Sequence, residues 1–321
     1  MRARFISSGS DRRSAAGRGG YALWFSVLVI ALLPSAGARA HSPRVGDSDA
    51  KVAASVVNDP ELSSGFQLLY ELKFDEARER FTKWEQEHPT QSLGPALEAA
   101  SDLFEEFYRK EVLTSEFFLN DKRLLGGIKD EPDAALEQQF ASAAQRADKM
   151  ARSRLEKRPN DADALFALTL VGGMQADDLF LIQKRQLESM RHLREADRNA
   201  RILLAIAPNA DDAYVALGAA NYIIGCLPGY KRAMLWVGGV HGDKSLGMRQ
   251  LERAASSEHA HYLRPYARLM LALAALREKE PEVTRQQLRA LVAEFPENPL
   301  FAKELAKVKP VVSGVPLRNS P

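Results

Sequence analysis

The chain has 321 residues, of which 45% are hydrophobic and 27% are charged, which is ordinary for a soluble globular protein with a sizeable core. Residues 1–40 hold six arginines and one aspartate, so they contribute +5 to the net charge of +2 and leave −3 for residues 41–321. Because the chain beyond residue 40 is slightly acidic, it has no bulk electrostatic basis for binding nucleic acid.

The N-terminal segment has the three parts of a secretory signal peptide. Arginines precede an apolar run at 21–33, and small residues follow up to Ala38-Arg39-Ala40. The run is shorter than the ~20 residues that span a bilayer. We therefore predict a signal peptide over 1–40, cleaved near Ala40/His41, and a periplasmic or secreted protein. The alternatives are an uncleaved anchor and, from Arg12-Arg13, a twin-arginine signal.

Residues 41–57 are polar and lack a clear period, which predicts a flexible linker. We expect the first helix to begin at Asn58-Asp59-Pro60-Glu61, because aspartate is a good N-cap and proline suits the first helical position. A helical domain is predicted over 58–308, followed by a disordered tail at 309–321.

Apolar residues recur at spacings of three and four within this domain, and no convincing period-two alternation occurs. Segments 93–108 and 134–155 each place a row of apolar side chains on one helix face, and 178–206 is typical of one long helix. The pattern predicts an all-α fold.

Two corners are near copies: Pro159-Asn160-Asp161-Ala162-Asp163-Ala164 and Pro208-Asn209-Ala210-Asp211-Asp212-Ala213. Each places asparagine and aspartate, which are capping residues, before an apolar helix. A looser third copy runs from Pro296 to Phe301. Recurrent helix starts of this kind indicate an internal repeat.

The repeat needs a small residue where two helices cross and large residues around it. Its positions are Gly65, Ala77, Phe81 and Pro89 in a first copy, Tyr214, Leu217 and Gly218 in a second, and Pro296 in a third. This spacing resembles the tetratricopeptide repeat (TPR). The resemblance implies antiparallel helix pairs stacked as a right-handed superhelix, an α-solenoid.

The prolines that close the helix pairs are irregularly spaced. Pro89, Pro159, Pro208 and Pro296 lie 70, 49 and 88 residues apart, against ~34 in a regular array. The sequence therefore predicts lengthened or inserted helices.

Three segments also resemble exported bacterial TPR-like proteins, which are distantly similar to a eukaryotic TPR-like group linked to the mitochondrial outer membrane. The segments are 74–77, 242–255 and 295–301, and the second of them supplies the repeat positions Gly247, Leu251 and Ala254. The resemblance covers roughly 58–305 and implies no defined chemistry.

The only cysteine, Cys226, excludes an intramolecular disulfide and any zinc site built on several cysteines. It lies in an apolar stretch, which favours a buried small side chain over a reactive thiol or an intermolecular bridge.

Two segments invite a ligand-binding interpretation. The glycines at 238–242 precede Lys244, but Asp243 breaks the phosphate-loop spacing, so we expect Asp243 to cap a helix that runs to Ala255. His259 and His261, with Glu258, are weak metal candidates, because a spacing of two does not place both rings on one helix face.

Paired acids are interpreted as helix caps and solvated faces. These pairs are Glu105-Glu106, Asp177-Asp178 and Asp211-Asp212. We therefore predict no catalytic residue and no cofactor, and a protein that is not an enzyme.

The stretch 222–238 is aromatic and apolar, with Lys231 and Arg232 inside it. It favours two core helices and their connection, with a membrane-surface or partner-binding hairpin as the alternative. The same two interpretations apply to 113–119.

The sequence predicts a protein–protein interaction scaffold of the cell envelope, which binds a peptide or partner helix on its concave face. The candidate binding residues are Gln67, Glu71, Asn221, Tyr230 and Trp236. The alternatives are a small-ligand- or metal-binding protein or enzyme with a site near the 222–261 turns, and a peripheral membrane protein.

Overall fold

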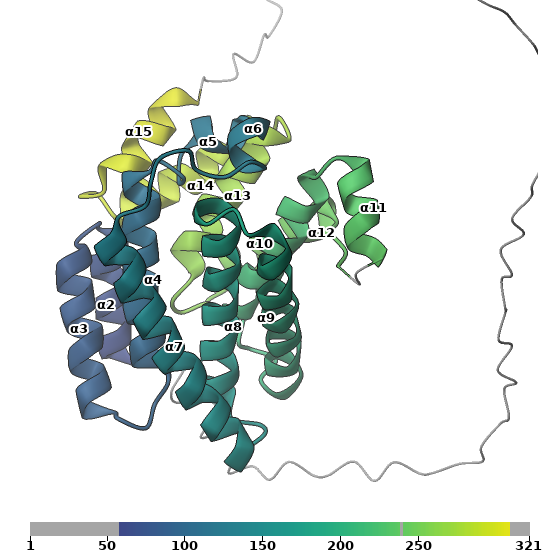
Figure 1. The fold of residues 1–321 in the computed structure, drawn as a ribbon. Coiled ribbons are helices and arrows are strands. Elements are labelled where there is room, and N and C mark those ends of the chain that lie inside the picture. Colours follow the sequence, from purple (N-terminus) through teal and green to yellow (C-terminus); the bar gives the residue numbers. More distant parts are fainter. Residues whose placement is uncertain (1–57, 238–239, 309–321) are drawn as a thin grey trace, which may run out of the picture. The chain divides into compact units, whose positions relative to one another are not determined.

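The computed structural model describes residues 58–237 and 240–308. Every regular element in these residues is helical, as the sequence predicts (Figure 1). The predicted signal peptide at 1–40, the linker at 41–57 and the tail at 309–321 lie outside the described residues.

The longer helices follow one another as antiparallel neighbours, and each packs on the next. Ten helices form five pairs: α2 (Pro60–Tyr70) with α3 (Phe74–Glu87), α4 (Leu93–Arg109) with α7 (Ala134–Lys157), α8 (Ala162–Asp177) with α9 (Gln186–Ile206), α10 (Ala213–Cys226) with α12 (Lys244–Ser256), and α13 (Arg264–Arg277) with α14 (Pro281–Glu294). Below, the first-named helix of each pair is called its first helix.

Shorter elements are inserted inside three of the pairs. These are α5 (Ser115–Leu119) and α6 (Asp121–Leu124) between α4 and α7, the π-helical turn η1 (Asp178–Ile182) between α8 and α9, and α11 (Gly229–Val237) between α10 and α12; α15 (Pro299–Lys307) follows the last pair. The predicted insertions are therefore present, and they lie within pairs.

Capping residues place the helix starts where the sequence predicts them. Asp59 accepts hydrogen bonds from the backbone N–H groups of Glu61 and Leu62, with Pro60 in the first turn of α2. Asp243 accepts from the N–H of Leu246 and starts α12, which confirms a cap where a phosphate loop was considered.

The first pair is packed through Gly65. A Cβ atom on Gly65 would lie 2.3 Å from a ring carbon of Phe81, so only glycine allows α2 and α3 to approach this closely. Ala77 and Phe81 are both fully buried. The small and large residues of the first predicted repeat copy therefore meet in space.

In the fourth pair, glycines allow a close helix–helix approach at two positions. A Cβ on Gly218 of α10 would lie 2.8 Å from the Leu251 side chain, and one on Gly247 of α12 would lie 2.5 Å from the backbone nitrogen of Tyr222. Leu217, Leu251 and Ala254 are buried, while Tyr214 is partly buried and stacks on the Arg253 guanidinium at 4.3 Å.

The prediction of one long helix over 178–206 is wrong. The helix breaks at Lys184, whose φ of 58° lies in the left-handed region, and α9 begins only at Gln186. A tertiary contact explains the break, because the backbone N–H of Ile128 donates to the Leu181 carbonyl at 2.7 Å. This carbonyl would otherwise accept a helical hydrogen bond from its own segment.

The two near-copy corners also differ in structure. Asp161 caps α8 by accepting from the N–H of Ala164. Asp212 makes no cap; it is buried and accepts from the backbone N–H groups of His261, Tyr262 and Leu263, at 3.0, 3.2 and 2.7 Å. Aspartates in nearly identical sequence contexts therefore differ in role: one caps its own helix, and the other accepts hydrogen bonds from a segment far away in the sequence.

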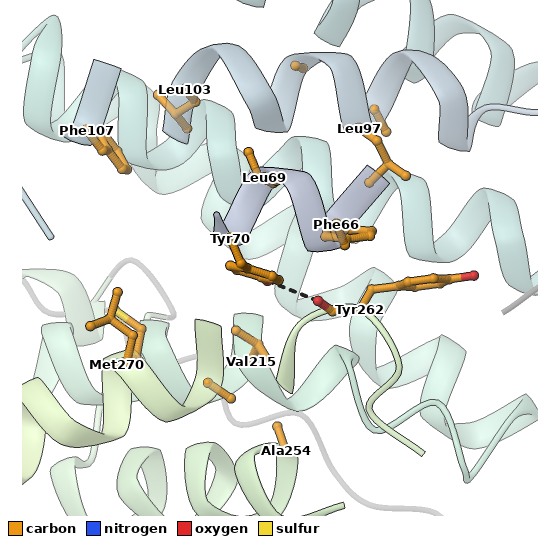
Figure 2. Close-up of a cluster of buried hydrophobic side chains, with 14 of the residues drawn as sticks. Phe66, Leu69, Tyr70, Leu97, Leu103, Phe107, Val215, Ala254, Tyr262 and Met270 are labelled. Carbon is orange, nitrogen blue, oxygen red and sulfur yellow. Dashed lines mark hydrogen bonds between the residues drawn. The ribbon is translucent and has the colours of Figure 1, made fainter. Parts of the chain in front are cut away.

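Side chains of the first pair contact the last pair (Figure 2). The Tyr70 hydroxyl donates to the Tyr262 carbonyl at 3.0 Å, and the backbone N–H of Asp59 donates to the Tyr262 hydroxyl at 2.8 Å. The Asn298 amide donates to the Tyr70 carbonyl at 2.6 Å, and the Tyr70 and Phe295 rings lie 5.5 Å apart. One hydrophobic core runs from Leu62 to Val308 as a result.

By length and composition, the segment Ala162–Ile182 could cross a membrane. Of its most apolar window, 56% is buried within the protein. A core helix of a soluble protein has these same properties.

Candidate functional site

A cavity of about 210 Å³ lies among the first helices of all five pairs. Helix α9 and the short elements α5, α6 and η1 complete its wall, which is mostly apolar. Phe66 of α2, Phe107 of α4, Val215 of α10 and Met270 of α13 are among the lining residues, and Figure 2 shows them in the buried cluster.

Small residues on the first helices leave the space open. Ala100 of α4, Gly173 of α8, and Ala216 and Ala220 of α10 all line the cavity. A Cβ added to Gly173 would meet no atom within 4 Å. The cavity is partly open to solvent, since its lining residue Asp177 is exposed.

Three hydroxyls of the cavity wall are engaged with backbone carbonyls. Thr169 donates to Leu165, Ser189 donates to Ala176, and Tyr70 donates to Tyr262, over distances of 2.8 to 3.0 Å. These groups satisfy their donors within the protein and have no free proton for a ligand.

Asp177 of the cavity wall differs from these three hydroxyl groups. Its carboxylate accepts no hydrogen bond and makes no ion pair with any residue of the described ranges. The side chain is surface-accessible, and yet it lies deep among protein atoms. The two observations agree because the space that it faces is the cavity.

The surroundings of Asp177 disfavour its charge. Burial, and then the neighbouring charge of Asp178, raise the pKa of Asp177 to about 7. Tyr266 lines the same cavity, and burial followed by the charge of Asp177 raises its pKa. Among the described lining residues there is no lysine, arginine or histidine to offset the carboxylate.

A second acid, Asp197 of α9, also lines the cavity, but it has a partner. Arg201 forms an ion pair with Asp197 at 2.8 Å, one helical turn further along α9. Asp177 is therefore the one acid of the described wall whose charge is left without a counter-charge.

The interpretation of the paired acids as caps and solvated faces is wrong for most of them. Glu106, Asp178, Asp211 and Asp212 are buried, and Asp177 faces the cavity. Burial is the main reason why the pKa of Asp178 rises to about 6 and that of Asp212 to about 7. Sequence spacing carries no signal for this, because acid pairs of the same kind also cap helices.

The predicted partner-binding residues do not form one surface. Gln67 and Glu71 of α2 hydrogen-bond to each other at 2.7 Å. Asn221 is buried, and its amide donates to the Leu217 carbonyl and to Gln250 of α12. These three residues do not line the cavity.

The remaining two partner-binding residues lie on α11. Tyr230 is 67% exposed and Trp236 is 66% exposed. In the segment 113–119, by contrast, Phe117 and Phe118 are buried, and Leu119 is the only exposed apolar side chain. For these two side chains of α11, the favoured interpretation of 222–238 as core helices is therefore wrong, and they are exposed as in the alternative interpretation.

The weak metal candidates are both exposed, with ring centroids 6.5 Å apart. Across the described ranges, no three histidine, cysteine or acidic side chains are grouped as metal ligands would be. Cys226 is half-buried, and burial raises its thiol pKa, which disfavours the reactive thiolate.

Comparisons with protein-family models, with curated proteins and with solved structures found no match to this chain.

Proposed function

We propose that this protein binds an apolar small molecule in the cavity among its first helices, and that it is a binding protein rather than an enzyme. The cavity carries the proposal. An engineered apolar cavity of about 150 Å³ binds benzene, so a cavity of about 210 Å³ suits a somewhat larger ligand, such as a medium-length alkyl chain.

The fold supports the same proposal. We propose that the five pairs are a divergent TPR-type array, a right-handed α-solenoid, in which the first helices line the inner face. The close approaches at Gly65, Gly218 and Gly247 support this interpretation, because such an array needs small residues at its helix crossings. With the predicted leader, the protein would act in the periplasm or outside the cell.

A peptide-binding scaffold, which is the expectation from the sequence, has less support. The cavity wall is mostly apolar, whereas an extended peptide needs partners for its backbone groups. Gln67, Glu71 and Asn221, which were expected to supply such partners, hydrogen-bond within the protein.

The test is a variant that fills the cavity. Gly173→Leu places a side chain where the structure leaves space, so the helix should accept it without a clash. We expect wild-type protein to bind 1-octanol in a saturable, one-to-one manner by isothermal titration calorimetry. The variant should lose at least about tenfold in affinity, because each displaced methylene is worth ~0.8 kcal/mol.

Gly229→Leu is the matched control. Gly229 also has open space around its Cβ position, but it begins α11 and does not line the cavity. Its variant should bind 1-octanol as the wild type does. Equal binding by the wild type and Gly173→Leu, or no saturable binding by the wild type, would refute the proposal.

A second candidate function is peripheral membrane contact through α11. The exposure of Tyr230 and Trp236 favours it, because aromatic side chains with polar ends partition into the membrane interface. We expect wild-type protein to float with liposomes that contain anionic lipid, and the double variant Tyr230→Ser/Trp236→Ser to remain in the bottom fraction. Absence of flotation for the wild type would rule this function out.

A further inference from the structure

The cavity has one polar feature that its apolar walls do not explain. Asp177 contributes an exposed carboxylate to the cavity lining, without a hydrogen bond or an ion pair to any described residue. Solvent reaches this exposed side chain, but no donor or cation of the described residues compensates its charge. A structural role does not account for the residue, since it makes no contact that stabilises a helix end or a packing interface.

The charge balance around this carboxylate selects among ligands. Asp178 adds to the negative potential at Asp177, and Asp197 is neutralised by Arg201. No basic residue appears among the described lining residues. A ligand carboxylate would therefore meet repulsion, while a ligand cation would supply the missing counter-charge.

We propose that the cavity binds a cationic amphiphile, an apolar molecule with one protonated amine, and that the ammonium group donates its hydrogen bonds to Asp177. This inference rests on the proposed function and specifies its ligand class. The apolar part of the ligand occupies the space beside Gly173 and Ala220, and the Asp177 carboxylate fixes its orientation. Pockets of this kind combine apolar walls with a few polar groups that set specificity.

Hydrogen-bond geometry favours a primary amine over a quaternary one. A primary ammonium has three N–H donors, which a carboxylate can accept directly, and charge-assisted hydrogen bonds are stronger than neutral ones. Quaternary ammonium groups lack such donors and are usually held by several aromatic faces.

The experiment compares three ligands of equal chain length at pH 8: octylamine, 1-octanol and octanoate. At that pH octylamine is protonated and octanoate is ionised, so the head group alone varies in charge. We expect calorimetry on wild-type protein to give at least about tenfold tighter binding of octylamine than of 1-octanol, since charged hydrogen bonds contribute that much. Octanoate should bind most weakly.

Asp177→Asn tests the residue, and Asp197→Asn is its matched control. In Asp177→Asn, octylamine should lose its advantage over 1-octanol, while 1-octanol keeps its wild-type affinity. Asp197→Asn also removes an acid from the cavity wall, and it is combined with Arg201→Gln so that no unpaired cation is left beside the cavity; the ratio should then persist. Circular dichroism of each variant confirms that it is folded.

The outcomes separate the two proposals. If 1-octanol binds and octylamine binds no better, or if Asp177→Asn keeps the preference for octylamine, then the cavity binds apolar ligands without this selectivity and the inference fails alone. If none of the three ligands binds to folded wild-type protein, the proposed function fails together with the inference.

Discussion

At the scale of single residues, Asp177 is costly for folding. Its raised pKa, about 7, means that the folded state holds a proton more tightly than the unfolded chain does, because an unperturbed aspartate has a pKa of about 3.9. The stability that this proton confers is fully present below pH ~4 and is lost as the pH rises through about 7. Residues that weaken the fold in this way are concentrated at functional sites.

We therefore expect Asp177→Asn to stabilise the ligand-free protein near pH 8 by about 0.5–2 kcal/mol, less than the pKa shift alone would give, because solvent reaches the exposed side chain and screens its charge. Chemical unfolding at pH 5 and pH 8 measures it, and the gain should be smaller at pH 5. The groups that interact with Asp177, namely Asp178 and Tyr266, remain in the variant, as does Asp197 of the same cavity wall. An equal gain at both pH values would contradict this assignment of the pKa.

Sequence patterns predicted caps well and buried acids poorly. Asp59, Asp161 and Asp243 cap helices because a cap depends only on residues two or three positions ahead. Asp212 has a similar local context, but its partners lie about fifty positions away at 261–263. No local pattern encodes such partners, and the same limit hid the role of Asp177.

At the scale of helices, three helices end in the same C-terminal motif, which the sequence does not indicate. Leu72, Glu111 and Lys279 have positive φ, between 56° and 67°, and each is the second residue after its helix, α2, α4 or α13. In each case the next residue donates its backbone N–H to the carbonyl five residues back, at 2.7 to 3.0 Å, which is a Schellman motif. Glycine normally signals this ending, and none of these positions has it.

Glycine at such a position should relieve strain. The left-handed conformation costs a non-glycine residue roughly 1–2 kcal/mol, and Lys279 is exposed, so its side chain makes little compensating contact. We expect Lys279→Gly to raise the free energy of unfolding by about 1 kcal/mol, after the entropy that glycine adds to the unfolded chain. Urea denaturation checks this, with Lys279→Ala as a control that should show no gain.

Helix starts were predictable and helix ends were less so. The segments 93–108 and 134–155 were predicted as helices from their apolar stripes, and α4 and α7 confirm them. The break at Lys184 could not be predicted, because it depends on a hydrogen bond from the backbone N–H of Ile128 to the Leu181 carbonyl. Periodicity reports which face of a helix is apolar, and it carries no information about a contact that ends the helix.

At the scale of the whole described region, contacts between the first and last pairs distinguish this protein from an open array. In an open array each repeat contacts only its neighbours, and the ends unfold with little effect on the rest. Here the Asn298 amide reaches the Tyr70 carbonyl across 228 positions of sequence. Such a bond couples α2 to the start of α15.

The coupling between α2 and the start of α15 can be measured in α2 after a substitution at Asn298. Asn298→Ala removes both the bond to Tyr70 and the cap of α15, and should cost about 1–3 kcal/mol. Asn298→Ser keeps a capping oxygen but is too short to reach Tyr70. By hydrogen–deuterium exchange, both variants should lose protection in α2, while only Asn298→Ala should lose it in α15. Unchanged exchange of α2 in both would show that the ends are independent.

Contacts between the first and last pairs also bear on how such a chain can grow. Another pair added at either end would have to displace Tyr70, Tyr262 or Asn298 from their mutual contacts. A segment inserted within a pair disturbs none of them, and its cost in loop closure rises only slowly with length. The extra elements of this protein, α5, α6, η1 and α11, all lie at such internal positions. Relatives that keep these contacts would therefore differ in length through segments inserted within the helix pairs, and the number of pairs would stay at five.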